Sequence, residues 1–452
     1  MLRQVAISCL IASLVLSAAA RTRPGYGGTL RVEVEGDPLQ QHGGLSRRLI
    51  FDGLTRIGSD GTPQPALAVR WASENSDHRW QFWLRSDVHF SDGSPLTSTV
   101  VESSLIGSCG GNCPWTAVHA VGPAIIFTGD SPMPNLPALL AGDDFLIAHA
   151  GNNNAGESSL MGAVVGTGVF QNNGLLNGVL TLVANDSCWQ GMPFVNKIEI
   201  SGHKSIRDQW LDLSVGHADV VEVPAEQIRQ AQQQHLSLIV SPPVTLLALA
   251  VSDSSILSNS SLRASIALAV DRSALSNVIF QKQGEVTASL LPSALTGYSF
   301  LFPTDRDLNK AHELRGGLTA PSLTLAAENN PTMQLAAQRL ALNLHEAGFS
   351  VQVANASTAL HKDLALLQLN QPSNQPQAAL ESMLRNVGVG SPVLENTPAG
   401  LYKTEREFLD THTLIPLLFL PRAYAVSGRV RDLRLSSDGS PLLADVSLGD
   451  AQ

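Results

Sequence analysis

Residue types that could carry out catalysis are present in this sequence, but their spacing matches no catalytic motif. There is no G-x-S-x-G, no H-E-x-x-H and no phosphate-binding loop. The 12 histidines are scattered, without a close-spaced pair of metal ligands. Asp143 and Asp144 lie in a glycine-containing loop that water can solvate, and His203 near Ser205 is a pairing that chance often supplies. Although a catalytic triad assembles in space rather than in sequence, the sequence favours neither an enzyme nor a bound cofactor or metal ion.

Two cysteines could react with each other. The segment SCGGNCPW places Cys109 and Cys113 four residues apart in a glycine-rich loop. In an oxidising compartment this spacing permits a local disulfide. A redox dithiol usually has two residues between its cysteines and opens a helix, so redox or metal chemistry is disfavoured. A Cys109–Cys113 disulfide and free thiols are both open interpretations, and Cys188 has no evident partner.

The overall composition and the N-terminus indicate the class of protein. The 452 residues are too many for one ordinary domain, so two or three domains are expected. A formal net charge of −10 and the lack of a Lys/Arg run argue against a nucleic-acid partner. Arg3 precedes the apolar run VAISCLIASLVLSAAA, so residues 1–20 are predicted to be a signal peptide cleaved after Ala20. The alternative is an uncleaved membrane anchor, although the run is short for a span. We expect export to the periplasm or the extracellular space.

The elements that would position a site alternate between strands and helices. Period-two alternation over residues 79–84 predicts a strand with one buried face, and Ser-Asp-Gly at 91–93 predicts the turn that follows. A helix within 333–347 has an apolar strand on either side, as in a βαβ unit. Asp271 can cap a further helix. The buried face of that helix is expected to carry Leu275, Val278 and Ile279. These patterns predict a mixed α/β chain of at least two lobes.

Five segments carry a resemblance to one protein family. The longest, Ile50 to Leu105, contains DGL, G-x-DG-x-x-x-PALA, W-x-F-x-LR and F-x-DG-x-PLT in that order. The other four are GGTLRVEVEGDP, VGTGVFQNNGLLNGVLTLVANDSCWQG, LRASIALAVDRSALSNVIF and LIPLLFLPRAYAVSGRVRDLRLSSDG. Together they resemble the family 5 extracellular solute-binding proteins of ABC transporters, which serve dipeptides, oligopeptides and nickel.

This resemblance implies an α/β fold of the periplasmic-binding-protein-like type II. Such a fold has two lobes with mixed sheets, an inserted scaffold domain, and a hinge that closes the lobes on a ligand. The first lobe is expected to be discontinuous, from residues 21–45, 160–245 and 420–452. The inserted domain is expected at 46–159 and the distal lobe at 246–419.

The resemblance also implies where a ligand would make contact. Glu35, Asp37 and His42 follow the first strand, where the chain of the family bends toward the ligand. The alternative for these three is a polar loop on the surface. Phe419 lies in LIPLLFL, a segment that reaches the ligand site in the family. A place in the core is the favoured interpretation for Phe419, and stacking on a ligand is the other.

One segment departs from the family pattern. Family members commonly have D-x-x-L-x-x-W followed by an acidic loop, and in peptide binders an Asp there meets the α-amino group of the ligand. Here DLALLQLNQPSNQPQ begins at Asp363, with Leu369 in place of the Trp and with Asn370 and Gln371 where the acidic loop would begin. Burying an ammonium without a counter-charge is costly, so neutral amides replace the carboxylate poorly. Asn370 and Gln371 could still line the site as hydrogen-bonding amides, or belong to a shortened surface loop.

The function that these observations predict is solute capture. We expect a monomeric receptor that takes a small solute, with short peptides as the leading class, and delivers it to the membrane permease of an ABC transporter. Two alternatives stay open: a sensor or chaperone-like binder with a degenerate site, and a receptor for nickel or another small solute. The lack of a histidine cluster disfavours direct ligation of nickel.

Overall fold

The computed structural model describes most of the chain after residue 24. The described residues are 25–39, 45–58, 61–108, 113–150, 164–253, 256–296, 302–317, 322–371, 375–389, 394–395 and 397–449. The predicted signal peptide, His42 and Cys109 lie outside them. Within these ranges the structure contains no apolar helix of the length needed to span a bilayer.

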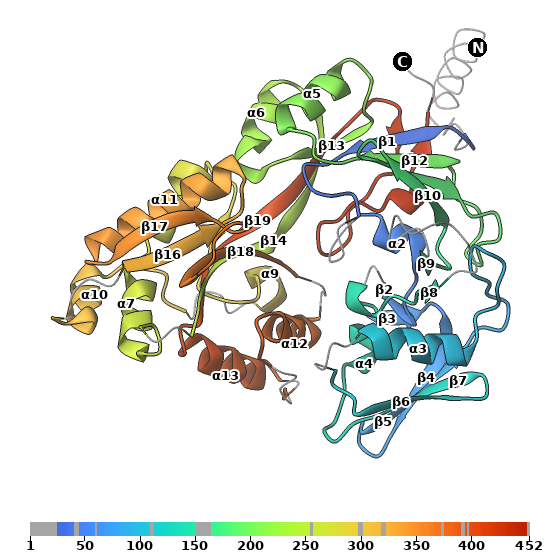
Figure 1. The fold of residues 1–452 in the computed structure, drawn as a ribbon, viewed down its shortest axis with the longest axis horizontal. Helices are drawn as coiled ribbons and strands as arrows, with labels where there is room; N and C mark the ends of the chain where they lie inside the picture. Colours follow the sequence, from blue (N-terminus) through green and yellow to red (C-terminus); the bar gives the residue numbers. More distant parts are fainter. Residues whose placement is uncertain are drawn as a thin grey trace, which may run out of the picture.

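One large mixed sheet runs through both halves of the molecule (Figure 1). Its strand order is β10-β11-β12-β1-β13-β19-β14-β18-β16-β17, and β15 pairs with β19 beside this path. The bounds of these strands are β1 Thr29–Glu33, β10 Phe170–Leu176, β11 Val179–Ala184, β12 Lys197–Ser201, β13 Val220–Val223, β14 Ser237–Val251, β15 Glu285–Val286, β16 Ser322–Ala327, β17 Ser350–Asn355, β18 Leu364–Asn370 and β19 Leu414–Val426.

Strands β14 and β19 are long because each crosses from one half of the sheet to the other. The C-terminal end of β19 pairs with β13, whereas the C-terminal half of β14 pairs with β18. Their mutual ladder shifts register between Val240 and Thr245, where Pro243 lies opposite Pro421. Proline donates no ladder hydrogen bond, so the pairing of β14 with β19 is interrupted at this point. The break lies between the part of the ladder next to β13 and the part next to β18.

The distal lobe has helices on both faces of its part of the sheet. Alternate residues of β14 enter two different cores, with Leu247 and Leu249 on one side and Leu246 and Ala248 on the other. Helices α7 (Ser260–Ala269), α10 (Leu308–Arg315) and α11 (Pro331–Glu346) contribute to the first core. Helices α12 (Pro376–Asn386) and α13 (Pro398–Leu409) contribute to the second. Burial on both faces explains why these strands are almost continuously apolar.

A separate antiparallel sheet with its own core follows the first strand in sequence. Its order is β4-β5-β7-β6, and α3 (Ser98–Ser108) packs against it. The bounds are β4 Ala68–Glu74, β5 Arg79–Leu84, β6 Ala117–Val121 and β7 Ala124–Thr128. Strand β5 buries Trp80, Phe82 and Leu84, as the alternation over residues 79–84 predicted. The predicted turn is also confirmed, since Asp92 Oδ1 accepts from the backbone N–H of Ser94 (3.0 Å).

Shorter elements complete the fold. The short helices are α2 Arg47–Ile50, α4 Leu136–Leu139, α5 Ile206–Ser214, α6 Ile228–Gln233, α8 Arg272–Ala274, α9 Ser293–Thr296, the 3₁₀ turns η1 Asp143–Phe145, η2 Ala225–Gln227 and η5 Leu443–Asp445, and the π-helical η3 Leu275–Ile279. The short strands are β2 Thr55–Ile57, β3 Pro63–Pro65, β8 His149–Ala150, β9 Val164–Val165, β20 Val430–Arg431 and β21 Ser447–Leu448.

One predicted buried face is wrong in part. Asp271 caps the next helix as expected, because its Oδ1 accepts from the backbone N–H of Ala274 (2.8 Å). Leu275 is buried, but Val278 is 67% exposed. The segment from Leu275 is a π-helix, whose wider turn rotates later side chains away from the face that an α-helix would bury.

Candidate functional site

Polar side chains of the two lobes meet beside the crossing strands. Asn330 Nδ2 donates to Glu35 Oε2 (3.1 Å), and Thr332 Oγ1 donates to Glu226 Oε1 (2.5 Å). Glu35 follows β1 and Glu226 lies in η2 next to α6, whereas Asn330 and Thr332 begin α11 of the distal lobe. The N-terminal end of α11 therefore lies against the carboxyl end of β1, and we take this junction as the candidate site.

The local sequence explains how Asn330 is oriented. Asn330 caps α11, with its Oδ1 accepting from the backbone N–H groups of Thr332 (2.9 Å) and Met333 (3.4 Å). Pro331 at the first helical position needs no donor partner, so it suits this start. Because the amide oxygen is engaged in the cap, the amide nitrogen is directed outward to Glu35. One side chain therefore both begins the helix and joins the lobes.

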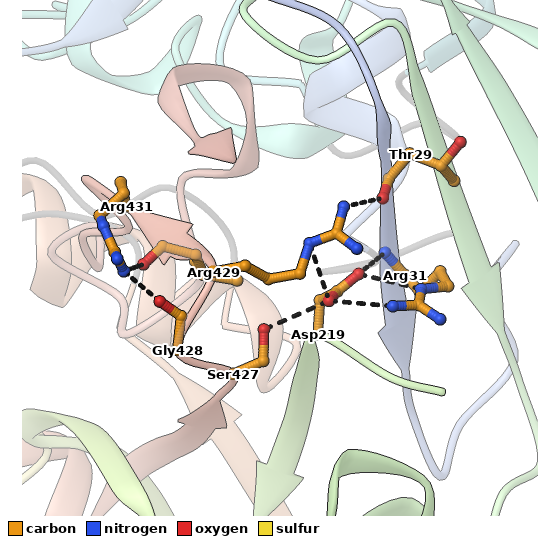
Figure 2. A network of polar contacts seen from close by, with 8 residues as sticks. Thr29, Arg31, Asp219, Ser427, Gly428, Arg429 and Arg431 are labelled. Carbon is orange, nitrogen blue, oxygen red and sulfur yellow. Dashed lines mark hydrogen bonds and ion pairs between the residues drawn. The ribbon is translucent and has the colours of Figure 1, made fainter. Parts of the chain in front are cut away.

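Strand β1, which places Glu35, is held by a buried carboxylate (Figure 2). Asp219 is 0% exposed, and its Oδ2 accepts from the backbone N–H (3.0 Å) and Nε (3.1 Å) of Arg31. Ser427 Oγ donates to Asp219 Oδ1 (3.2 Å), and Arg429 Nε lies 3.5 Å from that oxygen. Asp219 thereby joins β1, the start of β13 and the segment after β19. These contacts fix the strand that leads to Glu35 to the rest of the first lobe.

The junction is electrostatically negative. Glu222 Oε2 accepts from the backbone N–H of Glu35 (2.6 Å). Burial raises the pKa of Glu222, although this hydrogen bond and Arg422 partly oppose the rise. Glu35 is exposed, but partial burial and the nearby charge of Glu328 raise its pKa as well. A positively charged or hydrogen-donating group placed here would relieve the repulsion.

The three residues predicted after β1 have different positions. Glu35 lies at the junction between the lobes, as described above. Asp37 is exposed, and its Oδ1 accepts from the backbone N–H of Leu39 (2.8 Å), so it stabilises its own turn. His42 lies outside the described residues. Contact of Asp37 and His42 with a ligand stays a prediction.

Asn370 ends β18 next to β14, and Gln371 follows it. Asn370 is exposed, and its Oδ1 accepts from Thr245 Oγ1 (3.2 Å). Gln371 is buried, and its backbone N–H donates to the carbonyl of Val244 (3.3 Å). Asn370 thus presents its amide at the surface near the break in the β14–β19 ladder, whereas Gln371 is held against β14 by its backbone.

Phe419 lies inside the distal lobe. It is 1% exposed and packs in the same core as Leu290 and Leu380. Since hardly any of its surface can be reached, this placement supports the core interpretation over stacking on a ligand.

The cysteines are partly described. Cys113 is disulfide-bonded, and Cys188 is a free thiol. Because Cys109 lies outside the described residues, its pairing with Cys113 stays a prediction. Burial raises the pKa of the Cys188 thiol, and its Sγ donates to the carbonyl of Thr167 (3.7 Å). Such a thiol is a weak nucleophile at neutral pH. Among the described side chains, no group of three or more His, Cys, Asp or Glu is arranged to hold a metal ion.

Sequence reasoning missed the partners of Glu35. The dipeptide Asn330-Pro331 is a helix-start signal that could have located the beginning of α11. Neither that signal nor any other local pattern indicates that Asn330 reaches Glu35 or that Thr332 reaches Glu226, since these contacts depend on how the two lobes dock.

Comparison with known proteins finds one matching family and several solved structures with a similar fold. The family described as "Bacterial extracellular solute-binding proteins, family 5 Middle" matches residues 62–395. AgaA from "A.tumefacien R10", solved with agropinic acid, has a TM-score of 0.81 at 19% identity and covers 94% of this chain and 99% of its own. NikA from Staphylococcus aureus, solved with Ni(L-His)2, has a TM-score of 0.77 at 15% identity, with 93% and 100% covered. AppA from Bacillus subtilis, solved with a nonapeptide, has a TM-score of 0.75 at 14% identity, with 95% and 100% covered. These matches confirm the type II periplasmic-binding-protein-like fold.

Curated relatives are similar over shorter stretches. The oligopeptide-binding protein OppA of Bacillus subtilis is 31% identical over 111 residues, which are 21% of this chain and 20% of that protein. The probable D,D-dipeptide-binding protein DdpA of Escherichia coli is 24% identical over 366 residues, which are 76% and 66% of the two chains. In the matched segments this chain spans 20% of the length of OppA and 26% of the length of YhjP, an uncharacterized protein of Bacillus subtilis.

Proposed function

Since the chain belongs to the bacterial extracellular solute-binding proteins of family 5, a family of binding proteins, we propose that it captures short peptides between its two lobes. We further propose that the loaded protein delivers its solute to the membrane permease of an ABC transporter. The names of OppA, DdpA and the nonapeptide complex of AppA support the peptide class. The capture step would then be a closure of the lobes around the ligand.

The single observation that carries this proposal is the contact between Glu35 and Asn330. It joins one side chain that follows β1 of the first lobe to one that begins α11 of the distal lobe. A solute bound there would touch both lobes and would therefore stabilise the closed arrangement over the open one. We propose Glu35 as the acceptor for the α-amino group of a peptide, in place of the carboxylate that the segment after Asn370 lacks.

Domain boundaries follow from the same proposal. We assign residues 21–45, 160–245 and 420–452 to the first lobe, 46–159 to an inserted domain and 246–419 to the distal lobe. Separate hydrophobic cores support the three units. The start of the inserted segment packs in the core of the first lobe, so the boundary there is a close contact rather than a free linker.

We also propose that the mature protein acts outside the cytoplasm as a monomer. The description of its family as extracellular and the apolar N-terminal run support export after cleavage at Ala20. The first lobe and the inserted domain would remain on the same side of the hinge during closure.

Thermal shift against a library of di- to pentapeptides tests the peptide proposal. A peptide at 100 times its dissociation constant should add about 2.7 kcal/mol to the free energy of unfolding. Glu35→Gln should reduce the shift for peptides with a free amino group and leave the shift for N-acetylated peptides unchanged. Glu407→Gln, which alters an exposed carboxylate on α13, is the matched control. A flat response to all peptides would refute peptide capture.

A receptor for a different small solute is the second candidate. The neutral amides at Asn370 and Gln371 favour it, because an acidic segment is the usual partner of a peptide ammonium in this family. Relatives of this fold were solved with agropinic acid and with Ni(L-His)2. The same thermal-shift assay with opines, nickel–histidine and sugars separates this candidate from a sensor or chaperone-like binder, which would respond to none of them.

A further inference from the structure

A second contact between the two halves lies away from the crossing strands. Asn135 Nδ2 donates to Glu381 Oε2 (3.1 Å), and the guanidinium carbon of Arg385 lies 5.7 Å from the centre of the Phe145 ring. Asn135 precedes α4 and Phe145 ends η1, both within the segment that we assign to the inserted domain. Glu381 and Arg385 are one turn apart on α12 of the distal lobe. In Figure 1, α12 and α4 lie next to each other across the gap between the two halves.

Both sides of this contact are fixed to their own domains. Helix α12 buries Leu380 and Met383 in the core of the distal lobe. On the opposite side, Phe145 is buried against Trp115, and the carbonyl of Pro137 accepts from Thr55 Oγ1 (2.5 Å). The contact therefore depends on the position of the whole lobes rather than on the motion of one helix.

The charges at this contact are partly removed from water. Burial raises the pKa of Glu381, although the hydrogen bond from Asn135 opposes the rise. Burial lowers the pKa of Arg385, and the charges of Glu381 and Asp144 oppose that change. Desolvation of both charges thus opposes the attraction between them.

We propose that Asn135 and Phe145 form a reversible latch with Glu381 and Arg385 of α12. Because β14 and β19 already join the lobes at the register break, a second contact at a distance from it restrains rotation about that break. The latch holds the distal lobe against the inserted domain even without a ligand. The inserted domain, which would otherwise serve only as scaffold, thereby sets the fraction of closed molecules. Only the consequence for solute release rests on the proposed function.

Double electron–electron resonance on the ligand-free protein tests the latch. Spin labels on p-acetylphenylalanine at positions 121 and 360 leave the native cysteines untouched, and both positions are exposed, one in the inserted domain and one in the distal lobe. Glu381→Ala and Arg385→Ala should each lower the ratio of short to long distances about threefold or more. Glu407→Ala on α13 is the control and should leave the distance distribution unchanged.

The hydrogen bond between Asn135 and Glu381 can be removed by substituting either residue, so the test does not depend on one variant. Asn135→Ala should have the same effect as Glu381→Ala, and the double variant should add little to either. Unchanged distances in Asn135→Ala and Arg385→Ala, both folded by circular dichroism, would overturn the latch. Since no ligand is present, that result would leave peptide capture untouched. Conversely, a protein that binds no peptide can still show the expected opening.

Discussion

Removal of the Asp219 carboxylate should destabilise the first lobe by about 3 kcal/mol. Asp219 is fully buried and accepts from the backbone and side chain of Arg31, so Asp219→Ala leaves a buried N–H without its acceptor, which costs about 1–3 kcal/mol. Breaking a buried charge pair costs about 3–5 kcal/mol. The side chains of Arg31 and Arg429 are 31% and 30% exposed, so water takes over part of the lost interaction. We therefore expect the loss in the free energy of unfolding to lie near the lower end of the range for a buried charge pair, at about 3 kcal/mol.

Urea denaturation followed by tryptophan fluorescence measures this loss. Trp210 reports on the first lobe, since its Nε1 donates to the carbonyl of Glu222 (3.2 Å). The urea concentration at the midpoint should fall, while the slope of the free energy of unfolding against urea concentration should stay the same. Asp219→Asn keeps an acceptor for the backbone N–H but loses the charge, so about half of the loss is expected.

A surface ion pair in the same C-terminal segment supplies the control. Arg434 and Asp445 pair at 2.9 Å with side chains 70% and 55% exposed, and such pairs are worth about 0–1 kcal/mol. Asp445→Ala should therefore be nearly neutral. If Asp219→Ala costs no more than Asp445→Ala, the network in Figure 2 does not hold β1, and our account of how Glu35 is positioned fails.

Three further predictions concern single side chains. Because burial raises the pKa of Glu222, the folded protein binds this proton more tightly than the unfolded chain, so the free energy of unfolding should fall as pH rises above about 4.5. Glu222→Gln should therefore make the free energy of unfolding depend less on pH and should raise it at pH 7. Denaturation at several pH values measures this, and a lower stability of the variant at pH 7 would contradict the prediction. Asn330→Ala should cost about 1 kcal/mol through loss of the α11 cap and should weaken any peptide-induced thermal shift, whereas Asn330→Asp should keep the cap and lose the contact with Glu35. Glu405 is 0% exposed and accepts from Ser289 Oγ (2.6 Å) and the backbone N–H of Leu290 (2.6 Å). Glu405→Ala should therefore lower the free energy of unfolding, measured by urea denaturation, by about 3 kcal/mol or more. A loss below about 1 kcal/mol would refute its structural role.

Local signals in the sequence predict the elements well where one interaction decides the structure. Alternation over residues 79–84 depends only on which side chains enter the core, and β5 buries the expected set. Asp271 caps the next helix because its side chain needs a partner only three residues away. The exposure of Val278 could not be predicted in the same way. A π-helix is rare and arises from the packing around it, so periodicity alone cannot distinguish it from an α-helix.

The candidate site was harder to predict because its contacts join residues that are distant in sequence. Glu35 was predicted from the family resemblance, but its partner Asn330 lies 295 residues away. Asn330 itself would be explained fully by its cap, and only the docked lobes show that its amide nitrogen has a second partner. The same reasoning applies to α12, whose amphipathic pattern indicates a buried face but not that Glu381 reaches another domain. Residues that join domains satisfy local rules first, so their second role appears only when the lobes are in place. Variants that preserve the local role and remove the distant one, such as Asn330→Asp, are therefore the sharpest test of closure in this protein.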